Sequence, residues 1–139
     1  MAAPSSDSVL ILARTGDVPV EFEGRLLASD KSFSDSADSP DRGYELAIYK
    51  ASDGRWVAAL HYHSRWKSES NTSRVIVTDS VRELTAELME LDPLRDVVGY
   101  PPGKQFVEKQ KRLLDALEGQ YDSLLGRVLG MVPETAEKL

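Results

Sequence analysis

The chain has 139 residues, 41% of them hydrophobic, and its 17 basic and 23 acidic side chains give a formal net charge of −6. This length predicts a single domain over residues 1–139, and the absence of cysteine excludes disulfides, thiolate metal sites and a cysteine nucleophile. The acidic balance argues against a nucleic-acid binder, no apolar run is long enough to cross a membrane, and the lack of an export signal favours the cytoplasm.

The first third of the chain predicts a hairpin followed by a loop. Residues 9–14 and 18–28 are strand-like, and Thr15-Gly16-Asp17 between them has turn chemistry. In the second strand, Gly24 predicts a bulge or close packing, because glycine inside a strand often marks one of the two. The apolar stripe expected to be buried there is Val18, Val20, Phe22, Leu26 and Ala28. Residues 29–42, rich in Ser and Asp, predict a loop.

Residues 43–50 and 55–67 predict a second hairpin, whose register follows from its apolar stripes. A three-residue loop ending in a left-handed Gly54 pairs Leu46 with Leu60 and Glu45 with His61, whereas a two-residue loop mixes polar and apolar stripes. We therefore predict the three-residue loop. The stripe expected in the core is Trp56, Ala58, Leu60, Tyr62, Ser64 and Trp66. The stripe expected to be exposed is Val57, Ala59, His61, His63, Arg65 and Lys67.

Residues 74–78 predict a last strand, after which the apolar period changes to that of helices at 80–91 and 104–130. The first helix opens on a capping box from Ser80 to Glu83, and Gly119 could divide the second. Strands followed by helices predict an α+β fold, in which an antiparallel meander of four or five strands over residues 8–78 is packed on one face by both helices. The wide apolar face of the second helix predicts that it covers the sheet or pairs with another chain in a homodimer.

Both histidines of the chain, His61 and His63, are two residues apart on one strand and therefore point the same way. Residues 50–74 carry five basic against two acidic side chains, so this stretch is locally positive. We predict a non-enzymatic binding or regulatory module that contacts an acidic protein or a small anion. Its predicted contact surface is Glu45, His61, His63, Arg65 and Lys67.

Two alternatives involve metals. His61 and His63 with a carboxylate, from Glu45, Glu69 or the Ser/Asp loop, would form the ligand set of a metal-dependent enzyme. The Ser/Asp loop over residues 30–41 could instead bind Ca²⁺, which takes six to eight oxygen ligands, although it lacks the central glycine of an EF-hand. The oxygen ligands predicted for Ca²⁺ are those of Asp30, Ser32, Ser34, Asp35, Asp38 and Asp41.

A resemblance to known proteins covers residues 22–69 and not the C-terminal helices. The segments that carry it are Phe22-Glu23-Gly24, Leu27-Ala28, Tyr44-Glu45-Leu46, Tyr49-Lys50, Gly54-Arg55-Trp56-Val57 and Glu69. These segments are similar to those of small, little-characterised bacterial β-meander proteins, which include cyanobacterial calcium-binding regulatory proteins. The resemblance implies a non-enzymatic protein whose acidic loop takes Ca²⁺, and the serines at alternate positions of that loop depart from the pattern.

Overall fold

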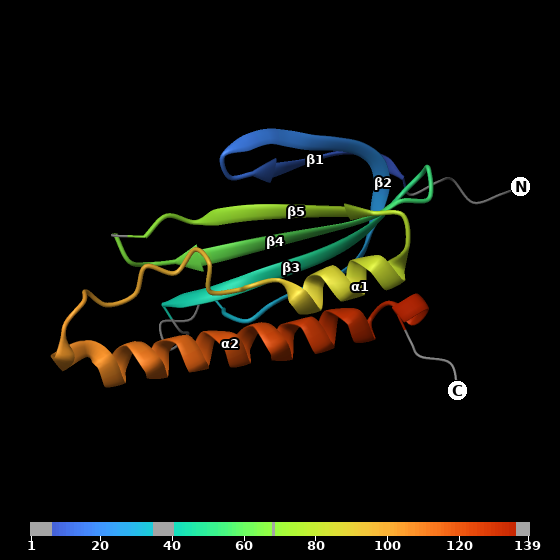
Figure 1. The fold of residues 1–139 in the computed structure, drawn as a ribbon. Coiled ribbons are helices and arrows are strands. Elements are labelled where there is room, and N and C mark those ends of the chain that lie inside the picture. The colour runs from blue at the N-terminus through green and yellow to red at the C-terminus, as the bar shows by residue number, and fades with distance from the viewer. Residues whose placement is uncertain (1–6, 35–40, 68, 136–139) are drawn as a thin grey trace, which may run out of the picture.

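The computed structural model describes residues 7–34, 41–67 and 69–135, and it has two layers (Figure 1). One antiparallel sheet contains five strands in chain order, and two helices follow it. The strands are β1 (Ser8–Arg14), β2 (Asp17–Lys31), β3 (Arg42–Ala51), β4 (Trp56–Ser64) and β5 (Thr72–Thr78). The helices are α1 (Val81–Glu90) and α2 (Val107–Gly130), with 3-10 turns η1 (Lys104–Phe106) and η2 (Pro133–Thr135). The predicted α+β meander with helices on one face is confirmed.

The predicted register of the central hairpin is also confirmed. Leu46 pairs with Leu60 and Glu45 with His61, and Gly54 closes the loop with a φ of 97°. The helix-facing stripes of β3 and β4 form the main core together with α1 and α2. Its fully buried side chains include Tyr44, Leu46, Ile48, Leu84, Leu88, Leu117 and Leu124.

Both helices lie where the sequence predicts them. The Ser80 hydroxyl accepts a hydrogen bond from the Glu83 amide at 3.1 Å, while the Glu83 carboxylate accepts from the Asp79 amide at 3.4 Å, so the capping box closes one residue earlier than expected. The second helix is continuous through Gly119. No helix in the described part of the chain is long and apolar enough to cross a membrane.

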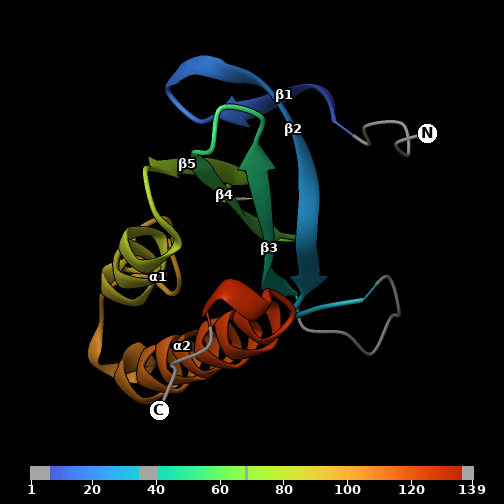
Figure 2. The ribbon, with the colours of Figure 1, turned by 90° about the vertical axis from the view of Figure 1, so that its right-hand side faces the viewer.

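The sheet is strongly curved, and this curvature corrects the expectation that the second stripe of β4 is exposed. The hairpin of β1 and the first half of β2 folds over the side of the sheet that faces away from the helices (Figures 1 and 2). A second, smaller core fills the space beneath it, with Phe22, Ala51 and Val57 at its centre. Val57 and Ala59 are consequently only 2% and 1% exposed.

The path of β2 corrects two further expectations. An irregularity between Leu26 and Ala28 inserts Leu27. Leu26 therefore pairs with Tyr49, which packs against the second core, while Ala28 joins the main core on the helix-facing side of the sheet. The predicted single stripe is therefore divided between the two faces, and Leu26 is 53% exposed. The strand also runs on to Lys31, so residues 29–31 are part of the sheet and not of a loop.

The end of β4 corrects the last element of the predicted core stripe. The strand ends at Ser64, and Trp66 beyond it is 47% exposed, with its ring 5.2 Å from the Arg42 guanidinium carbon. Trp56, in contrast, is buried in the main core. The last strand, β5, begins at Thr72, two residues earlier than predicted.

Candidate functional site

His61 and His63 lie on the same face of β4 as Val57 of the second core, near the end of the strand at Ser64, and the side chain of His63 is 37% exposed at this opening. The tip of the β1–β2 hairpin is fixed to β5, because the Thr15 amide donates to the Ser73 carbonyl at 2.9 Å and the Ser73 amide donates to the Thr15 hydroxyl at 2.7 Å. His61 is the cross-strand partner of Ser73 and so lies at the margin of the region that this hairpin covers. We name the group of side chains around this opening the histidine cup, formed by Lys31, Phe33, Glu45, His61 and His63.

The histidine cup is assembled by strand pairing. Glu45 on β3 is the cross-strand partner of both Lys31 on β2 and His61 on β4, and this places a carboxylate between a lysine and an imidazole. The two imidazole rings are 6.1 Å apart between centroids. The ring of Phe33 lies 4.8 Å from that of His63, and the Lys31 ammonium lies 5.5 Å from the Phe33 ring.

The two imidazoles differ in their polar contacts. Nδ1 of His61 lies 2.6 Å from the Ser73 hydroxyl oxygen, a hydrogen bond whose direction depends on the tautomer. Burial lowers the pKa of His61, and although Glu45 acts in the opposite direction, His63 adds to the lowering. Nε2 of His63 is shielded from solvent and has no hydrogen-bond partner in the part of the chain described, and its distance to Oε1 of Glu45 is 3.7 Å.

The two predicted cations beyond β4 are placed differently from one another. Arg65 donates its backbone amide to the Asp41 carbonyl at 2.9 Å and its guanidinium to the Ser34 carbonyl at 3.3 Å. A pocket of about 210 Å³ adjoins the cup and is lined by Phe33, Ser34, Asp41, Gly43, His63, Ser64, Arg65 and Asn71. The structure therefore brings His63 and Arg65 to one pocket, while Lys67 is exposed and not in its lining.

The metal predictions find no assembled site in residues 7–34, 41–67 and 69–135, where no group of three or more His, Asp or Glu side chains is placed to hold an ion. Asp30 accepts a hydrogen bond from Arg127 on α2 at 2.9 Å, and the Ser32 hydroxyl bonds Gln120 and the Tyr44 amide. Ser34 and Asp41 line the pocket beside His63. Asp35 and Asp38 lie outside the described residues, so binding of Ca²⁺ by residues 30–41 stays a prediction.

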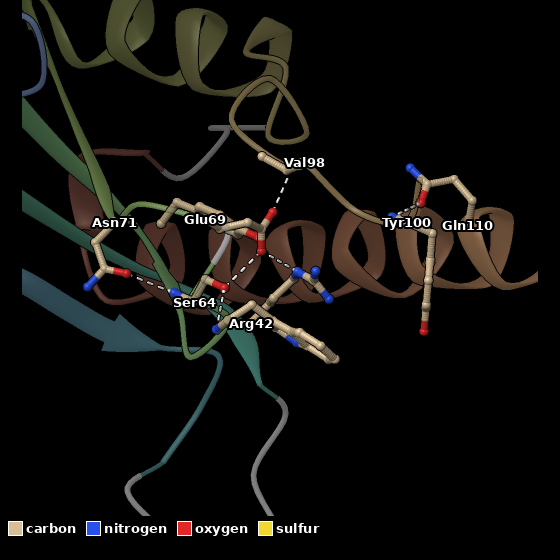
Figure 3. A network of polar contacts seen from close by, with 9 residues as sticks. Arg42, Ser64, Glu69, Asn71, Val98, Tyr100 and Gln110 are labelled. Carbon is tan, nitrogen blue, oxygen red and sulfur yellow. Dashed lines mark hydrogen bonds and ion pairs between the residues drawn. The ribbon is translucent and has the colours of Figure 1, made fainter. Parts of the chain in front are cut away.

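Glu69 belongs to a buried network that the sequence did not predict (Figure 3). Its side chain is fully buried, and the Arg42 Nε donates to it at 2.5 Å. The Ser64 hydroxyl, the Tyr62 hydroxyl and the Val98 amide donate to it at 2.8, 3.1 and 2.6 Å. Burial acts to raise the pKa of Glu69, but the bonds from Val98, Arg42 and Ser64 outweigh burial and lower it.

This network holds the segment that borders the pocket. Ser64 and Arg42 are the paired last and first residues of β4 and β3, while Val98 lies in the linker between the helices. Asn71 adds a side-chain bond to the Ser64 amide at 2.9 Å (Figure 3). Glu69 is therefore a structural carboxylate with its oxygens already bonded, and it does not supply the third metal ligand considered for His61 and His63. A lone acid in a polar turn gives no sequence signal for this role.

No protein-family model matches the chain, and no match was found among curated proteins or among solved structures.

Proposed function

We propose that this protein is a non-enzymatic binding module whose histidine cup takes an anionic group, a carboxylate or a phosphate. The anion could belong to a small molecule or to an acidic side chain of a partner protein, since the recognising chemistry is the same. The observation that carries the proposal is His63, which lines one pocket together with Arg65 and whose Nε2 atom has no hydrogen-bond partner among the described residues, its ion-pair neighbour being Oε1 of Glu45 at 3.7 Å.

The electrostatics of the cup support an anion that binds together with a proton. A buried polar atom without a partner is costly, and an oxygen ligand would relieve that cost by accepting from His63. An imidazolium makes a stronger, charge-assisted bond than a neutral imidazole, so the cup should bind the anion more tightly when an imidazole carries a proton. Glu45, 3.7 Å from His63, opposes a second negative charge.

The chain offers a direct measurement of this binding. It contains two histidines, so a carbon–proton NMR spectrum of the imidazoles has two sets of signals to follow. We would titrate the protein with inorganic phosphate and, separately, with a capped tri-aspartate peptide. The proposal predicts a saturable shift of the His63 signals by at least one probe, and the stronger probe distinguishes a small-molecule ligand from an acidic protein.

Variants make this test specific. His63→Gln should weaken binding about 10- to 150-fold, because a charge-assisted bond contributes about 1.5–3 kcal/mol. Glu45→Gln should strengthen binding by removing the competing carboxylate. Arg55→Gln is the control, since it removes an exposed cation in the opposite hairpin loop and should leave binding unchanged. If neither probe shifts the His63 signals, or if His63→Gln binds as well as the parent, the proposal is wrong.

A further inference from the structure

The two halves of the C-terminal helical segment carry opposite charge. Residues 98–112 contain four basic side chains and one acidic side chain, whereas residues 113–135 contain four acidic side chains and one basic side chain. In the first half these are Lys104, Lys109, Lys111, Arg112 and Glu108; in the second they are Asp115, Glu118, Asp122, Glu134 and Arg127. Of these ten, only Arg127 takes part in an ion pair among the described residues, with Asp30.

The basic half also carries an apolar groove. The first fully buried residue of α2 is Leu117, and Figure 1 shows the earlier turns projecting past the ends of β3 and β4 together with the preceding linker. A groove of about 650 Å³ runs along these turns, lined mainly by Val98, Tyr100, Pro101, Pro102, Phe106, Val107 and Leu114. Val98 and Val107 are 59% and 61% exposed, so the sheet does not cover this part of the helix.

Helical spacing places complementary groups on one stripe of α2. At about 100° per residue, Lys111 and Glu118 point in nearly the same direction, with Val107 and Asp122 close beside them. If two such helices meet antiparallel about a two-fold axis near Leu114, Lys111 faces Glu118 of the partner subunit. The symmetry repeats that pair, because a two-fold interface uses the same patch on both subunits.

We propose that this protein forms a homodimer by antiparallel pairing of α2 with α2 of a second copy, with Lys111 opposite Glu118 across the axis. A second copy fits better than an unrelated acidic protein, because the acidic side chains of the chain's own α2 follow its basic half on the same stripe of the helix. Pairing also covers the exposed apolar turns of both subunits at once. The interface lies on the helical layer, whereas the histidine cup lies on the opposite side of the sheet, so the two proposals are independent.

The oligomeric state gives the first test. Sedimentation equilibrium of the full chain should show a mass that rises with concentration from 15.4 kDa toward twice that value in dilute buffer. The mass should fall back toward the monomer in about 0.5 M salt, because salt screens ion pairs at an interface rim. A monomer at every concentration in dilute buffer overturns the proposal and would mean that the apolar groove binds a partner of another sequence.

Charge reversal tests the geometry. Lys111→Glu and Glu118→Lys should each weaken dimerisation about tenfold, and the double variant should recover most of that loss, because the reversed charges again face each other. Lys109→Glu is the matched control: it makes the same charge change from an exposed position on the far side of α2 and should have little effect. Circular dichroism of each variant confirms that the helix is intact. Failure of the double variant to recover dimerisation, or an equal loss in Lys109→Glu, contradicts this pairing.

Discussion

At the scale of single residues, Glu69 shows how one carboxylate can join segments that are distant in the sequence. Its partners come from β3, from β4 and from the linker before α2, so its charge is satisfied only when all three are in place. Breaking a buried pair by removing one partner is strongly destabilising, since the other charge stays buried without compensation. Arg42, whose side chain is 9% exposed, would be left in that state.

Glu69→Gln should therefore lower the free energy of unfolding at pH 7 by about 3 kcal/mol, the scale for loss of one member of a buried pair. Urea unfolding of both proteins measures the difference. Asp53→Asn is the comparison, because the Asp53–Arg55 pair is exposed on both sides and its loss should change the midpoint very little. Equal effects of the two substitutions would contradict the structural role of Glu69.

The pH dependence of this difference follows from the lowered pKa of Glu69. A carboxyl whose folded pKa lies below its ordinary value of 4.5 stabilises the protein above that pH, and the contribution is lost as the pH falls through the folded value. The deficit of Glu69→Gln should accordingly shrink as the pH is lowered from 5 toward 3. A deficit that is constant over this range would mean that Glu69 acts through packing and not through its charge.

At the scale of secondary-structure elements, two glycines make opposite predictions. A Cβ at Gly24 in β2 would lie 2.4 Å from the Lys50 carbonyl oxygen, and this backbone atom cannot move aside. A Cβ at Gly119 in the middle of α2 meets nothing within 4 Å. Gly24→Ala should destabilise the fold by about 1–3 kcal/mol through overpacking. Gly119→Ala should stabilise it by about 0.5–1 kcal/mol, because glycine is a poor helix former. Thermal melts show whether each substitution raises or lowers the melting temperature. A higher melting temperature for Gly24→Ala would show that β2 and β3 are less closely packed than described.

The same elements show what the sequence could and could not predict. The β3–β4 register was predictable, because only one loop length aligns the apolar stripes and puts Gly54 at a left-handed position. The irregularity between Leu26 and Ala28 was not predictable, because Leu26, Leu27 and Ala28 are all apolar and their order does not reveal which of them is inserted. The end of β4 was also missed, because Ser64 and Trp66 continue the alternation and the bonds of Ser64 to Glu69 and Asn71 are long-range.

At the scale of the whole molecule, β3 and β4 are shared by two apolar cores on opposite faces of the sheet. Their burial on both faces comes from the folding of the β1–β2 hairpin over them. Strand periodicity does not encode this tertiary contact, and Val57 and Ala59 were therefore expected to be exposed to solvent. His61 and His63 were expected on the face of β4 opposite Trp56, and the paired strands place them there. Only the fold shows that the hairpin tip is bonded to Ser73, the cross-strand partner of His61.

Shared central strands predict that sheet and helices unfold together. In Trp66→Phe the remaining indole, Trp56, is 5% exposed in the core between the layers and reports on their contact. Its fluorescence and the far-ultraviolet circular dichroism should therefore give the same urea midpoint, as in a two-state transition. An earlier loss of the helical signal would show that α1 and α2 dissociate from an intact sheet.

The extra residue at Leu27 has a consequence for how this protein can change. Because Leu27 is inserted within β2, this strand passes without a loop from the hairpin over the second core into the part of the sheet that packs against the helices. The residues before Leu27 contribute only to the smaller of the two cores. The residues that follow form the part of the sheet that packs against the helices. The core side chains of the segment from Ser8 to Leu26 belong to the small core and not to the main core, so changes in this segment should act first on the face that carries His61 and only indirectly on α1 and α2.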